Sequence, residues 1–308
     1  MVKIIYLDID GTLRDEQKGI PGSAIWALEQ CKKRNIQIVI CTGRNLGSIQ
    51  DDVMALQADG IISGGGCYIQ YHGEEVFKKH FSMRVLSKAL SVAAVWKLSL
   101  AVEAERKIYM DHKASVFYRN DFQRKIYGSS KTEQKILCIK NKISYEENFE
   151  DVKSDAPNIH KICILGKQDA VERLEKELGK DAETIQKKKW DNSWYLELLP
   201  KGCHKGNAVK KLNRKLGISK RESMSFGDSE NDIAMMEATG IAVIVGCGSP
   251  EMEKYASSIC EPVMEGGVYR ELLRRNVIKS CEKERRVGNE EIMVAGRSCV
   301  PDISEKFL

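Results

Sequence analysis

Three groups of polar residues in this 308-residue chain directly follow apolar runs that have the character of buried strands. They are Asp8-Ile9-Asp10-Gly11-Thr12, Thr42-Gly43-Arg44 and Gly227-Asp228-Ser229-Glu230-Asn231-Asp232. In open parallel sheets, ligands bind beyond the carboxyl ends of the strands, near the point where the strand order reverses. The sequence therefore predicts one polar crevice to which all three groups contribute.

Four aspartates would share that crevice: Asp8, Asp10, Asp228 and Asp232. At the low dielectric of a protein interior their carboxylates would repel one another strongly. A divalent cation relieves this repulsion, and Mg²⁺ suits carboxylate sites that leave positions open for water and substrate phosphate. We therefore expect Mg²⁺ as the cofactor and a phosphate ester as the substrate.

Such a crevice would support phosphoryl transfer in two steps. Asp8, bound to the cation, would attack phosphorus and form an aspartyl-phosphate, while Thr42 and a lysine hold the phosphoryl group. Asp10, two residues further on, would protonate the leaving alcohol and later deprotonate the attacking water. Gly11 allows the sharp turn that this loop needs after its strand.

Each motif also has a purely structural explanation that stays open when the motif is taken alone. An Asp-Gly pair after a strand is typical of a plain turn, and Asp228 or Ser229 would cap a helix that begins near Asn231. Thr-Gly-Arg is too short to indicate a function by itself. The order of the motifs and their shared position at strand ends favour the catalytic interpretation.

All the motifs in order, with Lys205 between the second and the third group, resemble the haloacid dehalogenase (HAD) superfamily of phosphohydrolases. Within it the resemblance is to the Cof-type branch, subfamily IIB, which carries a C2-type cap. The likeness covers about residues 3–65 and 195–274. It implies a Mg²⁺-dependent phosphomonoester hydrolase that acts on a small phosphorylated metabolite, a sugar phosphate or a phosphorylated cofactor, through an aspartyl-phosphate intermediate.

The resemblance implies a role for each matching residue. Asp8 would be the nucleophile, Asp10 the general acid and base, and Lys205 the cation that neutralises the phosphoryl group. The catalytic set is then Asp8, Asp10, Thr42 and Lys205. Substrate phosphate would be bound by Thr42, Gly43, Arg44, Lys205 and Asn231. The metal would be bound by Asp8, the backbone carbonyl of Asp10 and Asp228, with Asp232 in support.

Three positions leave alternatives. Lys201 also precedes a glycine, but Lys205 directly opens an amphipathic helix, whose N-terminus favours phosphate. Arg44 would either contact the substrate or tie down its own loop. Gly65 stands where family members often carry an asparagine that faces the substrate, which indicates a permissive loop or an altered leaving-group pocket.

The elements that must position these residues alternate strand and helix in the two outer parts of the chain. Strands are expected at 3–7, 36–41, 60–63, 223–226 and 241–245, and helices at 23–34, 46–56, 205–216, 231–239, 250–257 and 268–275. Continuous apolar strands between amphipathic helices predict a Rossmann-like α/β core, a doubly wound parallel sheet covered on both faces.

The middle of the chain does not follow that alternation. Helices are expected at 85–98 and 169–178, and strand-like segments at 100–104, 108–110, 136–139 and 159–165. The long interval between Thr42 and Lys205 accommodates an inserted α+β domain, whereas the short interval between Asp8 and Thr42 does not. We therefore predict a discontinuous core (1–82 and 191–274), a C2-type cap (83–190) and a peripheral C-terminal extension (275–308).

Composition excludes several classes of protein. The chain has 49 Lys and Arg against 44 Asp and Glu, and these charges are mixed along its length rather than concentrated as in nucleic-acid binders. Its ten cysteines are scattered singly, which favours free thiols in a reducing compartment. No uncharged apolar run approaches the ~18 residues of a membrane span. We expect a cytoplasmic protein whose partner is a small phosphate ester, neither nucleic acid nor membrane; the oligomeric state is not indicated.

Two other functions fit the same motifs. A C2-capped phosphomutase would move phosphate between hydroxyl groups and release little of it. A non-catalytic binding or regulatory protein could also retain the fold. The complete set of Asp8, Asp10, Lys205 and Asp228 favours turnover over the latter.

Overall fold

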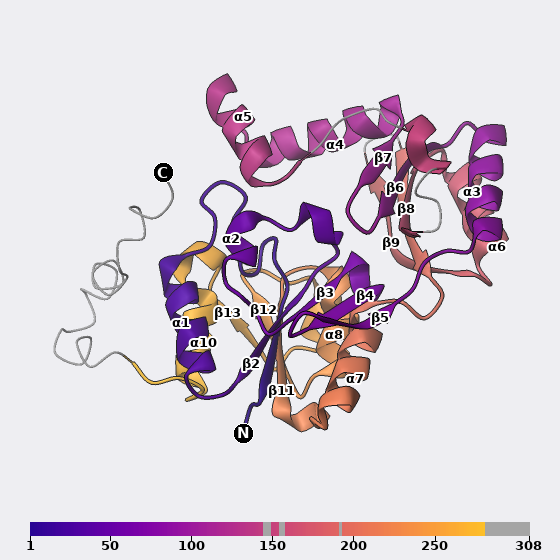
Figure 1. Cartoon of the computed structure of the whole chain (residues 1–308). Coiled ribbons are helices and arrows are strands. Elements are labelled where there is room, and N and C mark those ends of the chain that lie inside the picture. Colours follow the sequence, from indigo (N-terminus) through magenta and orange to yellow (C-terminus); the bar gives the residue numbers. More distant parts are fainter. Residues whose placement is uncertain (144–148, 154–157, 191–192, 281–308) are drawn as a thin grey trace.

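The chain folds around two β-sheets (Figure 1). The computed structural model describes residues 1–143, 149–153, 158–190 and 193–280. An eight-stranded sheet is formed by the two outer parts of the sequence, and a five-stranded sheet by the middle. This arrangement confirms the predicted Rossmann-like core with an inserted α+β unit.

The eight-stranded sheet has the order β13-β12-β11-β1-β2-β3-β4-β5, parallel from β13 to β3 and antiparallel in β4 and β5. Because β1 lies between β2 and β11, the strand order reverses beside β1, where ligands bind in such sheets. The strands are β1 (Ile4–Leu7), β2 (Gln37–Cys41), β3 (Gly60–Ser63), β4 (Tyr68–Tyr71), β5 (Glu74–Lys78), β11 (Ser223–Gly227), β12 (Ile241–Val245) and β13 (Ser258–Cys260).

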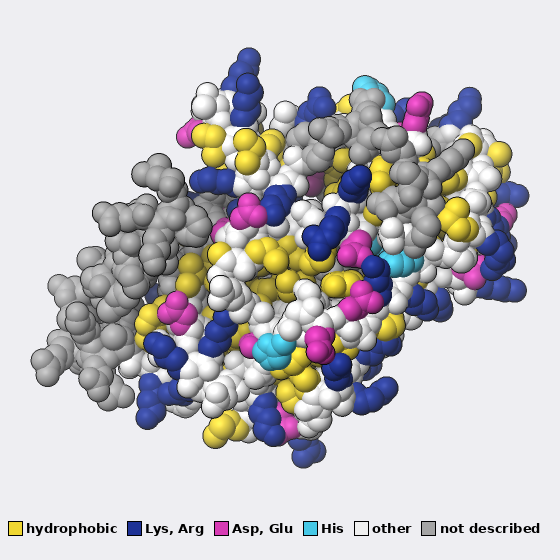
Figure 2. Space-filling view, viewed as in Figure 1, with side chains coloured by type: hydrophobic (Ala, Val, Ile, Leu, Met, Phe, Trp, Pro, Cys, Tyr) yellow, Lys and Arg dark blue, Asp and Glu magenta, His cyan; other side chains and the backbone are white. Residues whose placement is uncertain are grey.

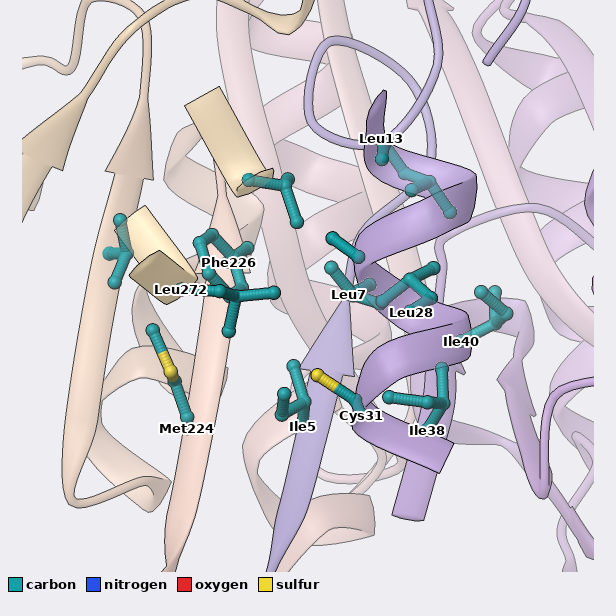
Figure 3. Close-up of a cluster of buried hydrophobic side chains, with 14 of the residues drawn as sticks. Ile5, Leu7, Leu13, Leu28, Cys31, Ile38, Ile40, Met224, Phe226 and Leu272 are labelled. Carbon is teal, nitrogen blue, oxygen red and sulfur yellow. The ribbon is translucent and has the colours of Figure 1, made fainter. Parts of the chain in front are cut away.

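Helices cover both faces of this sheet because successive strand residues point to opposite sides. One face buries Ile5 and Leu7 of β1 under α1 and α10 (Figure 3). The opposite face buries Ile4 and Tyr6 under α7 and α8. The core helices are α1 (Gly22–Lys32), α2 (Asp51–Met54), α7 (Lys205–Leu216), α8 (Ile233–Ala238), α9 (Pro250–Glu253) and α10 (Gly267–Arg274).

The five-stranded sheet is antiparallel, with the order β7-β6-β8-β10-β9. Its strands are β6 (Ser99–Ala104), β7 (Ile108–Met110), β8 (Ile159–Gly166), β9 (Ala182–Trp190) and β10 (Ser193–Pro200). α3 (Met83–Val95) and α6 (Gln168–Leu178) pack on one face, and α4 (His112–Lys125) packs on the other. From there α4 and α5 (Lys131–Lys140) extend over the side of the core that carries α2 (Figure 1).

Several elements differ from the sequence-based expectations. Residues 136–139, expected as a strand, lie in α5, which begins with a capping box formed by Ser130 and Glu133. The helix expected at 46–56 is only a 3₁₀ turn followed by the short α2. Elements that the sequence reading did not anticipate are β4, β5, α4, β9 and β13.

The predicted boundary between residues 190 and 191 falls within the β9–β10 hairpin. Because β10 pairs with β8 and β9, we propose that the inserted domain ends after Pro200 instead; the rest of the predicted division stays a prediction. The first residues of the predicted peripheral extension are not peripheral, since Val277 and Ile278 are buried in the cluster beneath α1 and α10. Residues 281–308 lie outside the described part of the chain.

Candidate active site

The loops that follow β1, β2 and β11 meet at one edge of the core sheet and bring the predicted motifs together. Gly11 has a φ of 81°, a left-handed conformation that glycine adopts without strain. A Cβ atom at Gly11 would lie 2.2 Å from Oδ2 of Asp228. Gly11 thus permits both the turn after β1 and the close approach of the first and third motifs.

Lys205 joins the two acidic motifs. Its Nζ lies 2.6 Å from Oδ1 of Asp8, 2.6 Å from Oδ1 of Asp232 and 3.1 Å from Oδ1 of Asn231. The residue begins α7, which is capped by His204, whose Nδ1 accepts a hydrogen bond from the third residue of the helix. By contrast, Lys201, the alternative considered from the sequence, is exposed.

Burial and crowding control the charges of this cluster. Burial raises the pKa of Asp8 well above its usual range, Lys205 lowers it, and Asp232 and Asp228 raise it further. Burial, together with the charge of Asp232, raises the pKa of Asp228 to about 7. Burial alone would lower the pKa of Lys205, but Asp232 and Asp8 raise it, so the lysine keeps its positive charge.

The acidic cluster has the donor set of a hard divalent cation. Asp8, Asp228 and Asp232 each offer a carboxylate oxygen, and these oxygens all lie within 4.8 Å of one another. Thr12 donates a hydrogen bond to Oδ1 of Asp228 at 3.0 Å, which orients that carboxylate. Oxygen ligands and a residual negative charge fit Mg²⁺. The side chain of Asp10 is not part of this cluster, and the prediction for that residue concerned its backbone carbonyl.

The side chain of Asp10 instead pairs with Arg44. Nε of Arg44 lies 2.5 Å from Oδ2 of Asp10, Nη2 lies 2.9 Å from Oδ1, and Gln50 donates to Oδ1 at 3.1 Å. Although burial would raise the pKa of Asp10, the charge and hydrogen bonds of Arg44 lower it below the usual value. Of the two roles considered for Arg44, the contacts favour tying down a loop, in this case the loop of Asp10.

Thr42 and Gly43 follow β2 in the same crevice. Thr42 is buried, and its Oγ1 accepts a hydrogen bond from the backbone N–H of Arg44 at 3.1 Å. A Cβ atom at Gly43 would meet no atom of the described residues within 4 Å, so a ligand can approach this backbone closely. The carbonyl of Gly43 accepts a hydrogen bond from Nζ of Lys161, a residue of β8, at 2.9 Å.

Gly65, the departure from the family pattern, has a φ of 64°. A Cβ atom there would lie 2.7 Å from Cδ1 of Leu199 on β10. A side chain at this position would therefore require Leu199 to move. Leu199 fills the space next to this position.

Four residues near the site were not singled out from the sequence: Arg14, Gln50, Asn141 and Lys161. Each is buried, and each contacts a predicted site residue or its loop. Asn141 and Lys161 come from the inserted domain, about 100 residues from their partners, and no local spacing signals such contacts. For Arg14 the available signal was its nearness to a motif, since it follows Asp8 by six positions.

The chain that carries this site belongs to the haloacid dehalogenase-like hydrolases: the model of that family matches residues 5–272. The match confirms the sequence-based prediction of an enzyme of this family. The YxeH protein of Bacillus subtilis is 27% identical over 271 residues, covering 87% of this chain and 96% of that protein. The HMP-PP phosphatase of Klebsiella pneumoniae is 26% identical over 256 residues, covering 82% and 87%.

Solved structures agree on the fold. The HAD subclass IIB sugar phosphatase BT4131 superimposes with a TM-score of 0.70 at 21% identity and covers 90% of this chain and 100% of its own. Within the described residues, no helix has both the length and the apolar character needed to cross a membrane. On the face in Figure 2, Lys and Arg side chains are spread over both parts of the molecule and mixed with Asp and Glu.

Proposed function

We propose that this protein is a Mg²⁺-dependent phosphomonoester hydrolase that acts on a small phosphorylated metabolite of the cytoplasm through an aspartyl-phosphate. One observation carries the proposal: Asp8 is buried at the switch point of the sheet, 2.6 Å from Lys205 and within one cluster with Asp228 and Asp232. A buried carboxylate with a fixed cation and two further acids is arranged for metal-assisted nucleophilic attack.

In the first step, a carboxylate oxygen of Asp8 forms a bond to phosphorus while the bond from phosphorus to the leaving oxygen breaks. Asp10, which Arg44 keeps ionised in the free protein, must take up a proton as the substrate binds, and it gives that proton to the leaving oxygen. Lys205 restrains Asp8 and balances charge on the phosphoryl group, and the open backbone at Gly43 receives a phosphoryl oxygen. Mg²⁺, held by Asp8 and Asp228, would reduce the repulsion between the nucleophile and the negatively charged phosphate.

In the second step, Asp10 takes a proton from water, the water oxygen bonds to phosphorus, and the bond between phosphorus and Asp8 breaks. Inorganic phosphate leaves and both aspartates return to their starting states. The names of the relatives, an HMP-PP phosphatase and a sugar phosphatase, support small phosphorylated molecules as the substrate class.

Phosphate release from an aryl phosphate in the presence of Mg²⁺ tests the proposal directly. The wild type should release phosphate, EDTA should stop the release, and Asp8→Asn should abolish it because the amide is not a nucleophile. Asp169→Asn is the matched control, since Asp169 is an exposed acid on α6 and should leave the rate unchanged.

Release that survives Asp8→Asn would overturn the assignment of the nucleophile. Activity that EDTA leaves intact would remove the metal from the proposal. Transfer of phosphate to a second hydroxyl with little free phosphate would favour the phosphomutase alternative.

A further inference from the structure

Helices α4 and α5 form an arm of the inserted domain that reaches the core beside the catalytic loops (Figure 1). Asn141 is the C-cap residue of α5, directly after Lys140, and it is completely buried. A buried polar amide needs hydrogen-bond partners within the protein.

Asn141 makes three hydrogen bonds to the core. Its Oδ1 accepts from Nη1 of Arg14 at 2.5 Å, and its Nδ2 donates to the carbonyl of Glu16 at 2.8 Å. Its backbone carbonyl accepts from Nη1 of Arg44 at 3.1 Å. The same Nδ2 also donates to the carbonyl of Leu137 at 2.9 Å, within the arm itself.

Two of these bonds connect Asn141 indirectly to the carboxylate of Asp10, one through Arg44 and the other through Arg14. Arg44 holds both oxygens of Asp10 through its Nε and Nη2. Arg14 belongs to the loop of Asp10: its backbone N–H donates to the carbonyl of Ile9 at 2.9 Å, and its own carbonyl accepts from Gly11 at 3.0 Å. Asn141 therefore contacts both the partner of Asp10 and the loop that carries it.

The contacts of Asp10 leave it able to act. Three donors reach its two oxygens, two from Arg44 and one from Gln50. A carboxylate offers about four acceptor sites. The fourth site lies on Oδ2, which has Arg44 as its single donor among the described residues, and it can face the leaving group.

We propose that Asn141 is a positioning residue for the acid step: it couples contact between the α4–α5 arm and the core to the placement of the Asp10 carboxylate. This inference rests on the proposed function, because it assumes that Asp10 protonates the leaving oxygen. Asn141 touches neither the reacting atoms nor the metal cluster, so its effect passes through Arg14 and Arg44.

Comparing two leaving groups tests this role. A nitrophenolate leaves without a proton, whereas an alkoxide requires one as its bond to phosphorus breaks. The value of kcat/KM reports the steps up to loss of the leaving group, so it isolates the acid step from later hydrolysis of the aspartyl-phosphate. A misplacement of about 1 Å can lower a rate ~10²-fold.

Asn141→Ala removes the side-chain bonds to Arg14 and Glu16 and keeps the backbone carbonyl for Arg44. It should lower kcat/KM for an alkyl phosphate by roughly 10–100-fold and for nitrophenyl phosphate by less than about threefold. Asp10→Asn should show the same selectivity with a larger loss. Asp51→Asn is the matched control: it removes the ion pair of 2.6 Å between Asp51 and Lys142, which joins the same arm to the core without contact to Arg14 or Arg44. Asp51→Asn should leave kcat/KM unchanged for both the alkyl phosphate and nitrophenyl phosphate.

Equal losses on both substrates, or no loss, would show that Asn141 has only a structural role and would overturn the inference. If Asn141→Ala does not fold, Asn141→Asp retains the acceptor for Arg14 but loses the donated bonds, and its loss should be selective in the same direction. If Asp10→Asn itself shows no selectivity, the acid assignment in the proposed function is wrong and the inference falls with it.

Discussion

Two buried lysines, one in each part of the molecule, sit among carboxylates in similar ways. Lys205 of the core lies 2.6 Å from both Asp8 and Asp232, and Lys161 of the inserted domain lies 2.8 Å from Glu103 and 3.8 Å from Glu197. Each lysine side chain exposes less than a tenth of its surface to solvent. The two clusters differ in what surrounds the lysine.

The core cluster has an excess of acid, since Asp228 joins the two carboxylates that Lys205 already balances. The lysine of the other cluster instead uses one of its hydrogens across the domain interface, on the carbonyl of Gly43. In the core, the buried lysine thus lies beside a third carboxylate, as the proposed metal site requires. In the inserted domain, the buried lysine joins two domains through a backbone carbonyl.

The largest effect is expected from removing the lysine of the core. Lys205→Met leaves Asp8 and Asp232 buried without their cation, and breaking a buried pair in this way costs about 3–5 kcal/mol. We expect the free energy of unfolding in urea to fall by that amount, and phosphatase activity to be lost. A metal-free variant as stable as the wild type would contradict the role given to Lys205.

A smaller effect is expected from Lys161→Met. It leaves one carboxylate, Glu103, without its close cation, whereas Lys205→Met leaves two, because Glu197 lies 3.8 Å away and keeps the hydrogen bond from Tyr195. We therefore expect a loss of about 1–3 kcal/mol. The same urea titration measures it, with Lys3→Met as a control, because Lys3 forms an exposed pair with Glu222 and should change stability little. A loss as large as that of Lys205→Met would remove the distinction between the two clusters.

The smallest effect concerns pH and magnesium. The folded-state pKa of Asp228 is raised to about 7, so the metal-free folded protein holds an extra proton below that pH and loses stability as pH rises toward it. Binding of Mg²⁺ must displace that proton. The stabilisation by Mg²⁺ should therefore be greater at pH 8 than at pH 6, by up to about 1.4 kcal/mol for each pH unit below 7. Thermal unfolding at fixed Mg²⁺ measures this, and an equal shift at both pH values would refute it.

The core could be predicted from sequence because its strands are buried on both faces. Segments such as Ile4–Leu7 are apolar throughout, and the polar residues of the site follow directly. The change from apolar to polar residues therefore marks both the end of the strand and the start of the motif. Lys205 could be chosen over Lys201 by its place at the start of an amphipathic helix. Hydrogen bonds now join it to Asp8 and Asp232, although the catalytic roles stay predictions.

The inserted domain was harder to predict for identifiable reasons. Residues 136–139 are apolar enough to resemble a strand, and the capping box of Ser130 and Glu133 was the overlooked sign of a helix. One element of the core was missed as well: the β4–β5 hairpin turns at His72 and Gly73, both with positive φ, where only the glycine is a usual turn residue. The partners of Asn141 lie about 100 or more residues away, beyond any local pattern.

The position of β1 between β2 and β11 has a consequence for synthesis of the chain. Ile4 pairs with Ser223 and Leu7 with Phe226, so one edge of the strand that leads to Asp8 has no partner until more than 200 further residues have been made. At ~5–20 residues per second this takes roughly 10–40 s. All five strands of the inserted domain lie in that interval, between residues 99 and 200, so they leave the ribosome before the core sheet can close around β1.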